Sequence, residues 1–140
     1  MKNLLSREEQ EAYLYSRKGE PVNFKYPEPP YFLKGKLLDR YVTFVAEDDW
    51  VVYWNMIDLI HFEGEDEDWL RITYYRYKKK ERKWVFAGQT ALSNPISGFI
   101  KLFANAVKEK EWIRPVFREV YKRCSNELNL EKPYRTKRVD

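Results

Sequence analysis

The feature that most constrains the fold is a series of strand-like segments between residues 33 and 89, separated by short polar intervals. Residues 41–46 are rich in β-branched and aromatic side chains and are followed by a run of acidic residues. Residues 69–78 and 83–89 have the same character, and the charged residues 79–82 lie between them. Such segments favour β-strands, and the short charged interval indicates a hairpin.

Residues 50–62 admit two interpretations. Nearly all of them are apolar, and polar residues recur at every third position from Asn55 to His61, a spacing that suits a helix ending at Gly64. The high content of β-branched and aromatic residues favours a bent strand instead. We prefer the strand, and we expect the acidic residues 63–68 to form a solvated turn after it.

Helices are predicted on both sides of this series. Ser6 precedes acidic residues and a partial apolar stripe, as at a helix N-cap, and predicts a helix over residues 7–18. The Asn-Pro pair at 94–95 is a second start signal, because apolar residues follow it at helical spacing. Pro115 opens a third helix, whose apolar stripe includes Cys124 as a small buried residue.

The order of elements predicts an α+β fold built on a four-stranded antiparallel β-meander. We expect the N-terminal helix and the two C-terminal helices to pack on one face of the sheet, which leaves the other face open. Residues 1–131 are expected to form a single α+β domain, since chains of about 100–200 residues usually fold around one core. Residues 132–140 are expected to be a basic tail with little apolar surface to bury.

Composition restricts the cellular compartment and the kinds of chemistry that are expected of this protein. The 140 residues include one Cys and one His, too few for an intramolecular disulfide or a Cys/His zinc site. The longest apolar run, residues 50–54, is far shorter than the roughly 20 residues of a transmembrane helix. The chain begins with no secretory signal, so a cytoplasmic protein is expected. High Lys and Glu content with few Cys, Met and Gln is typical of thermophiles.

Charge is divided unevenly along the chain, although the net charge is only +4. Residues 1–70 hold 8 Lys and Arg against 15 Asp and Glu, whereas residues 71–140 hold 18 against 7. Between Arg71 and Lys83, seven cationic residues accompany a single acid, Glu81. Positive charge concentrated in one segment indicates a polyanionic partner.

Strand alternation predicts a nucleic-acid-binding face on the hairpin. If Lys78 pairs with Lys83, aromatic side chains of both strands gather on one face, which we expect to be the open one. Bases stack on aromatic rings, and Lys and Arg neutralise phosphates, so such a face suits single-stranded nucleic acid. The candidate stacking residues are Tyr75, Tyr77, Trp84 and Phe86. The candidate phosphate-binding residues are Arg71, Lys78, Lys80 and Lys83.

This hairpin and the helix entry Leu92-Ser-Asn-Pro-Ile-Ser-Gly-Phe-Ile100 that follows it resemble two groups of proteins. One is the thermophilic archaeal single-stranded DNA-binding proteins called ThermoDBP, with their shorter relatives. The other is the PC4-like coactivators, whose four-stranded meander also leads into a helix. The resemblance covers about residues 33–110 and rests on element order, composition and size. It implies an antiparallel sheet with an aromatic, basic cleft for single-stranded DNA, and a homo-oligomer.

The sequence therefore favours a non-catalytic protein that binds single-stranded nucleic acid, DNA before RNA, with no metal or other cofactor. Two other classes stay open. An oligomeric interaction module would bury the same aromatic face against a partner chain, while the basic tip stays solvated. A metal-dependent nuclease would need Asp58, Glu81 and Lys83 in one site, but Glu81 is expected at the hairpin tip. His61 has no recognisable nucleophile partner, and an enzyme is disfavoured.

Overall fold

The computed structural model describes residues 3–25, 32–87 and 92–130. The helices are α1 (Arg7–Ser16), α2 (Ile96–Glu109) and α3 (Arg114–Leu130), with a short 3-10 helix η1 (Glu111–Ile113) between the last two. The strands are β1 (Pro21–Lys25), β2 (Phe32–Glu47), β3 (Val51–Phe62), β4 (Trp69–Lys78) and β5 (Lys83–Phe86). In these described ranges no helix is long and apolar enough to cross a membrane. The predicted basic tail, residues 132–140, lies outside them.

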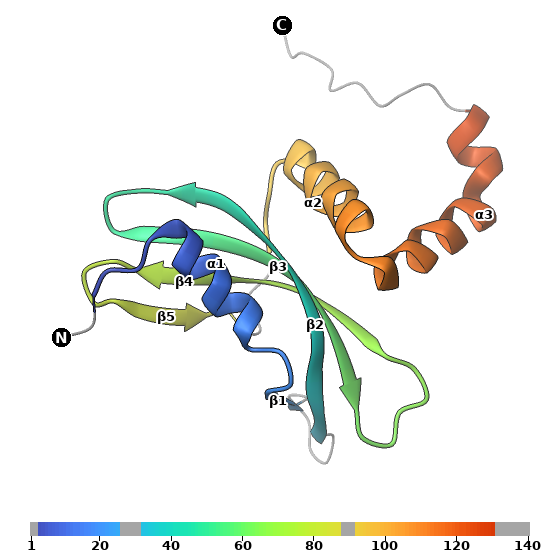
Figure 1. Cartoon of the computed structure of the whole chain (residues 1–140). Coiled ribbons are helices and arrows are strands. Elements are labelled where there is room, and N and C mark those ends of the chain that lie inside the picture. The colour runs from blue at the N-terminus through green and yellow to red at the C-terminus, as the bar shows by residue number, and fades with distance from the viewer. Residues whose placement is uncertain (1–2, 26–31, 88–91, 131–140) are drawn as a thin grey trace, which may run out of the picture.

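All five strands form one antiparallel sheet in the order β1-β2-β3-β4-β5 (Figure 1). The predicted α+β class and the antiparallel meander are confirmed, with five strands in place of four. The additional strand is β1, which follows α1 and pairs with the beginning of β2. Residues 51–62 form a strand, as preferred, and pair with β2 on one side and β4 on the other.

The sheet is strongly curled. Register shifts between Leu37 and Asp39 and again near Phe44 add residues to β2, and such bulges increase the local twist. At Gly35 the β2 backbone passes so close to the carbonyl of His61 that a Cβ atom would overlap it. The curl brings the rings of Phe24 in β1 and Trp69 in β4 to 6.4 Å between centroids, although these strands are not neighbours in the sheet.

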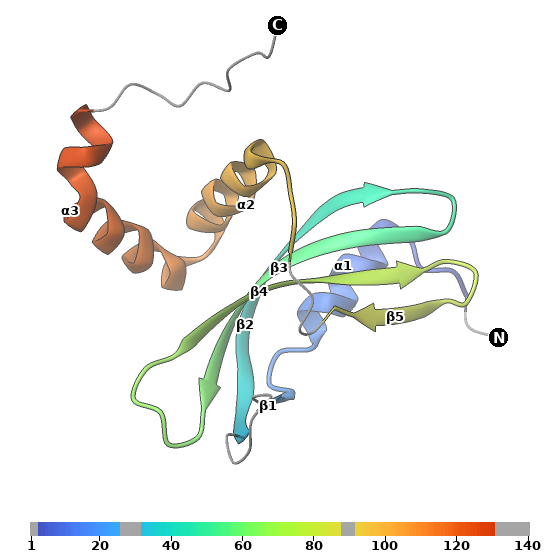
Figure 2. The same cartoon turned by 180° about the vertical axis from the view of Figure 1, so that it is seen from behind.

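The helices cover both faces of the sheet, not one face as predicted. Leu14 of α1 packs in a cluster with Trp54 of β3, whereas Leu102 of α2 packs in another with Ile57 of the same strand. Trp54 and Ile57 are an odd number of positions apart and therefore point to opposite faces. We call the α1 side the inner face and the α2 side the outer face. Figure 1 shows α1 in front of the strands, and Figure 2 shows it behind them.

Helix α1 is fixed to the inner face by its amino end. Ser6 caps the helix as predicted: its Oγ accepts a hydrogen bond from the Glu9 N–H at 3.1 Å, and the Glu9 side chain accepts one from the Ser6 N–H at 2.9 Å. Gln10 is buried, and its Oε1 accepts a hydrogen bond from the indole N–H of Trp54 at 2.8 Å. This polar contact orients α1 across the strands.

The C-terminal helices begin near the predicted positions but differ in detail. Pro95 occupies the N-cap of α2, so Asn94 does not cap the helix. Helix α3 starts at Arg114, one residue before Pro115. Cys124, which was expected to be buried, is exposed. Helix α3 packs through its first turns against α2 and extends away from the sheet (Figure 1), and much of its apolar stripe is not covered by the described part of the chain.

A buried ion network lies on the inner face. Arg40 of β2 and Asp58 of β3 are fully buried and joined by two hydrogen bonds, Nε to Oδ1 at 2.7 Å and Nη2 to Oδ2 at 3.3 Å. Arg71 of β4 donates to Oδ2 of Asp58 from Nε at 3.1 Å and from Nη2 at 2.8 Å. Nη1 of Arg40 donates to the carbonyl oxygen of Leu14 in α1 at 3.0 Å. One carboxylate thus joins three strands and, through Arg40, a helix.

A second ionic contact joins both helical layers to β2. Asp39 accepts hydrogen bonds from Nζ of Lys18 at 2.7 Å, Nζ of Lys110 at 3.2 Å and the indole N–H of Trp112 at 2.8 Å. Burial acts to raise the pKa of Asp39, but these three donors and the backbone N–H of Arg40 lower it to about 2. The carboxylate of Asp39 is therefore ionised in the folded protein at neutral pH.

Replacing the central carboxylate should destabilise the fold. Asp58→Asn should lower the free energy of unfolding by about 3–5 kcal/mol, because it leaves the buried Arg40 without a counter-ion. Urea unfolding followed by circular dichroism measures this. The matched control, Asp68→Asn, makes the same change in the exposed pair with His61 and should have an effect below about 0.5 kcal/mol. Equal losses in both variants would contradict the role of the network.

Acid should weaken the fold through Asp39. Its pKa is about 2 in the folded protein and about 3.9 in an unfolded chain, so the unfolded state binds the proton more readily. The stabilisation from Asp39 is therefore complete above about pH 4 and is lost as the pH falls toward about 2. Urea unfolding across this pH range should show a steeper loss for the native chain than for Asp39→Asn. Identical pH dependence of the two proteins would assign the acid loss to other groups.

Candidate nucleic-acid interface

The predicted β4–β5 hairpin is present, and its register decides where each predicted site residue points. It pairs Lys78 with Lys83, Tyr77 with Trp84, and Tyr75 with Phe86. Because side chains alternate along a strand, the four aromatic residues and Arg71 point to the inner face, whereas Lys78 and Lys83 point to the outer face. Lys80 lies in the turn. The residues predicted to stack on bases and the lysines of these strands are therefore on opposite faces.

Helix α1 covers the aromatic side of the hairpin. Tyr77 is 1% exposed, and its hydroxyl accepts a hydrogen bond from the Leu5 N–H at 3.2 Å. The ring of Tyr13 in α1 stacks on Trp84, with centroids 5.0 Å apart and planes 11° apart. The expectation of an open aromatic face is therefore wrong. The apolar side of α1 packs on the aromatic residues of the hairpin, which were predicted to stack on bases.

The remaining inner-face residues lie at the edge formed by β5. Phe86 is 38% exposed, and the guanidinium of Arg71 lies 4.8 Å from the centroid of its ring. Tyr75 is partly buried between Trp84 and Phe86. Burial raises the pKa of Tyr75, and the nearby charge of Arg40 acts against this shift. Of the five inner-face residues that the sequence predicted to bind nucleic acid, only Phe86 is exposed.

On the outer face, tyrosines and cations lie together near the hairpin turns. Tyr53 of β3 lies directly across from Arg76 of β4, and Asn55 lies across from Tyr74. Lys78 follows on β4 and pairs with Lys83 of β5. Both tyrosines are partly exposed. This surface therefore combines aromatic rings with positive charge, as the sequence predicted for the other side of the hairpin.

The cations of this surface have no carboxylate beside them. The outward positions of β3 from 51 to 57, of β4 from 72 to 78, and of β5 at 83 and 85 carry no Asp or Glu. Arg76, Lys78 and Lys83 make no ion pair with any residue that the structure describes. The Nε of Arg76 is buried and has no hydrogen-bond partner there either. The outer face of this hairpin is therefore positively charged and can attract an anion.

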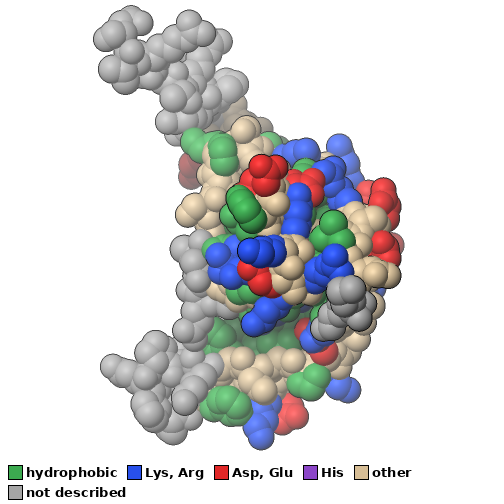
Figure 3. Space-filling view, turned by 90° about the vertical axis from the view of Figure 1, so that its left-hand side faces the viewer, with side chains coloured by type: hydrophobic (Ala, Val, Ile, Leu, Met, Phe, Trp, Pro, Cys, Tyr) green, Lys and Arg blue, Asp and Glu red, His purple; other side chains and the backbone are tan. Residues whose placement is uncertain are grey.

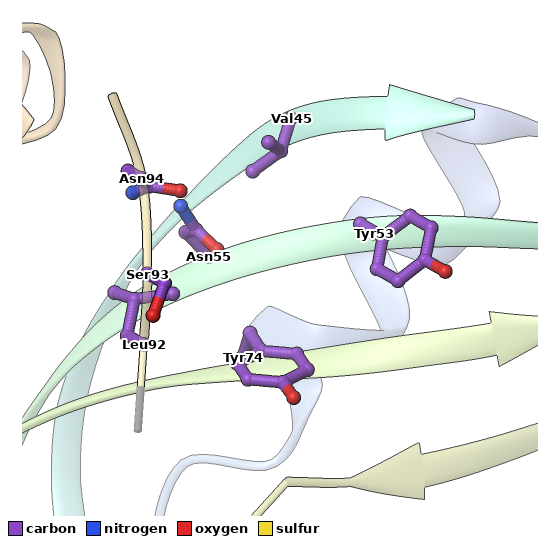
Figure 4. A pocket seen from close by; sticks show the side chains of 7 residues that line it. All are labelled: Val45, Tyr53, Asn55, Tyr74, Leu92, Ser93 and Asn94. Carbon is purple, nitrogen blue, oxygen red and sulfur yellow. The ribbon is translucent and has the colours of Figure 1, made fainter. Parts of the chain in front are cut away.

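A cavity of about 360 Å³ opens on the same face beside the two tyrosines (Figure 4). Its lining comes from three strands and from the segment before α2: Val45, Tyr53, Asn55, Tyr74, Leu92, Ser93 and Asn94. A smaller cavity of about 130 Å³ shares three of these residues and reaches Lys101 of α2. Cavities of about 300–1,000 Å³ lined by aromatic and a few polar groups are typical of sites for small organic ligands.

The β4–β5 turn adds further positive charge at the same end of the sheet, beside the acidic residues Glu47, Asp48 and Asp49 of the β2–β3 turn. Figure 3 looks onto the side where the β2–β3 and β4–β5 turns lie, and Lys and Arg side chains are grouped across the middle of that view. Lys79 is neutralised by Glu47 at 2.9 Å and also donates to the carbonyl of Asp48 at 2.7 Å, which ties the two turns together. Lys80 is exposed and lies beside them.

Sequence analysis missed Tyr53, Tyr74, Asn55 and Arg76. The alternation that placed Tyr77 on one face also places Tyr74, Arg76 and Lys78 on the other, so this signal was present in β4 itself. Leu70 and Ile72 share the outer face with them, and two such apolar side chains on a strand favour a buried face, which is why the aromatic face was expected to be the open one. In the structure these two residues are 39% and 41% exposed. Their apolar character did not decide which face is covered, because only the docking of the helices does.

The other constellations weighed from sequence are separated in space. Asp58 is held by Arg40 and Arg71 on the inner face, whereas Glu81 lies in the β4–β5 turn, so the nuclease set is not brought together. His61 pairs with Asp68 at 3.0 Å. Among the described residues, no group of three or more His, Cys, Asp or Glu side chains is placed to hold a metal ion.

Comparison with known proteins finds no matching family model, no matching curated protein and no matching solved structure. The function must therefore be inferred from the geometry of the surface.

Proposed function

We propose that this protein binds single-stranded nucleic acid, DNA before RNA, on the outer face of β3, β4 and β5. The observation that carries the proposal is the combination of Arg76, Lys78 and Lys83, none of which has an ion-pair partner in the described part of the chain, with two partly exposed tyrosines. Cations that lack internal partners remain available to phosphates. Tyrosines on the same surface supply rings on which bases can stack.

The arrangement suits a single strand better than a duplex. Tyr53 and Tyr74 are diagonal neighbours on adjacent strands, a relation in which Cα atoms are about 7–8 Å apart. Bases reach such rings only when they are not already stacked and paired. Lys78 and Lys83 lie toward the turn from these rings and can hold the sugar-phosphate backbone, and Lys80 can extend this contact.

The inner-face residues have a different role in this proposal. Tyr75, Tyr77 and Trp84 stabilise the contact between the hairpin and α1 and do not touch the strand. Arg71 is committed to Asp58. Of the residues predicted from sequence, Lys78, Lys80 and Lys83 therefore keep their predicted role as phosphate contacts.

Binding should depend on salt and on the outer-face tyrosines. Fluorescence anisotropy with a labelled single-stranded oligonucleotide should show affinity that falls steeply with salt, with a log–log slope of about 0.7 for each neutralised phosphate. The double variant Lys78→Ala/Lys83→Ala should lower that slope by roughly 1.4. Tyr53→Ala and Tyr74→Ala should each weaken binding by about 1–3 kcal/mol and affect duplex less.

Matched controls lie elsewhere on the chain. Lys36→Ala removes an exposed charge, and Phe32→Ala removes an exposed ring, both in β2 near the far end of β3. Neither should change affinity or salt slope. Affinity that is insensitive to salt, or equal losses in the control variants, would contradict the proposal.

Self-association is the second candidate, and a specific surface favours it. Large apolar side chains on α2 and α3 are 40–64% exposed: Ile96, Ile100, Val116, Val120, Tyr121 and Leu128. Exposed apolar side chains in this number favour burial against a partner, and a two-fold pair of α3 helices would cover those of α3 in both copies. This surface differs from the aromatic face of the hairpin, which the sequence suggested as the interface of an oligomer.

Light scattering coupled to size-exclusion chromatography should give a mass of at least twice 17.1 kDa. Val120→Glu should shift the protein toward the monomer, because it places a charge in the covered stripe. The exposed control Lys122→Glu should not. A monomeric native chain at tens of micromolar would exclude this candidate without affecting nucleic-acid binding.

A further inference from the structure

The cavity beside Tyr53 and Tyr74 contains two side-chain amides that the fold itself does not use. Asn55 is 5% exposed, and its amide makes no hydrogen bond to another described residue. The Nδ2 of Asn94 is buried and also lacks a partner within the described ranges. Buried amide atoms are nearly always hydrogen-bonded, and Nδ2 of Asn94 is an exception among the described residues. The amide of Asn55 keeps access to the cavity, so both side chains are available to hydrogen-bond a ligand there.

The two amides lie at one end of the cavity, and the tyrosine rings begin next to them. Figure 4 shows Asn55 and Asn94 pointing toward each other at one end, with Tyr74 and Tyr53 lying further along the strands. Asn55 lies directly across from Tyr74 on the neighbouring strand, so an aromatic ring and an amide are adjacent. A flat ligand that stacks on a tyrosine would present its edge to the asparagines.

The chemistry of an amide restricts the edge that it can read. Each asparagine offers one acceptor oxygen and one donor NH₂ group. Adenine presents the complementary pair, an acceptor at N7 and a donor at N6, and Asn forms two hydrogen bonds with it. When a base is read at this N7 edge, guanine presents two acceptors, N7 and O6, which would leave the Asn oxygen unpaired. A purine also offers a larger ring system for stacking than a pyrimidine does.

We propose that this cavity takes one unpaired adenine from the bound strand and that Asn55 and Asn94 recognise its edge. The inference rests on the proposed function and adds base preference to it. Lys101, which lines the smaller adjoining cavity, is placed to contact the phosphate of the same or the next nucleotide. Tyr53 and Tyr74 would then supply affinity for any base, and the two amides would supply selectivity.

The test uses the full chain and four oligonucleotides that differ at one position. A poly-dT strand of fifteen nucleotides carries thymine, adenine, guanine or an abasic site at its centre, and anisotropy gives the affinity for each. The native protein should bind the adenine strand roughly 5- to 150-fold more tightly than the guanine strand, the range typical of one good bidentate contact.

Two variants locate the preference. Asn55→Leu replaces the amide by an apolar group of similar size, and Asn94→Ala acts from the segment before α2, so one variant remains informative if the other fails to fold. Each should reduce the adenine preference to less than about twofold, while affinity for the all-thymine strand and the salt slope stay unchanged. The matched control Asn23→Leu, on an exposed position of β1, should keep the preference.

The outcomes separate this inference from the function on which it rests. Tight, salt-dependent binding with no base preference would overturn the adenine site and leave single-strand binding in place. A preference that survives both Asn variants would also overturn it. If no strand binds at all, the proposed function fails and the adenine site fails with it.

Discussion

The carboxylate of Asp58, held between Arg40 and Arg71, is the contact on which the rest of the structure depends. A charge buried without a partner is far less stable than one that is paired, so the three strands that carry these residues must keep their relative positions. A slip of one residue in the register of β3 would move Asp58 to the outer face and leave Arg40 buried alone. The network therefore specifies register as well as contact.

The same network sets the position of α1. Arg40 donates to the carbonyl of Leu14, and α1 then lies over the aromatic half of the β4–β5 hairpin. The rings of Tyr77 and Trp84 become part of a core as a result. Among the described residues, α2 packs on the outer face around Tyr41 and Ile57 and borders Thr43 and Asn55, so Tyr53 and Tyr74 nearer the hairpin turns stay partly exposed.

This division of the sheet explains why the outer face is the better candidate for binding. The positive charges of Arg40 and Arg71 on the inner face are both paired with Asp58 within the protein. Arg76 and Lys78 on the outer face have no such partner among the described residues, so their charge is available to a ligand. Tyrosines and amides close to them add stacking and hydrogen bonding, the two interactions by which single strands are held and distinguished.

The sequence by itself determined the Ser6 cap and the approximate starts of the last two helices. It also favoured a strand over a helix at 50–62 and indicated the hairpin register that pairs Lys78 with Lys83. These follow from interactions between residues close in the chain, namely capping, alternation and turn formation. Only the tertiary structure decided which face of the sheet each helix covers. That choice depends on contacts between distant residues, such as the hydrogen bond between Gln10 and Trp54. The alternation of side chains along a strand divides them between two faces but does not say which face a helix will cover. The lysines predicted to contact phosphate therefore lie on the outer face and in the turn, whereas the aromatic residues predicted beside them lie on the inner face.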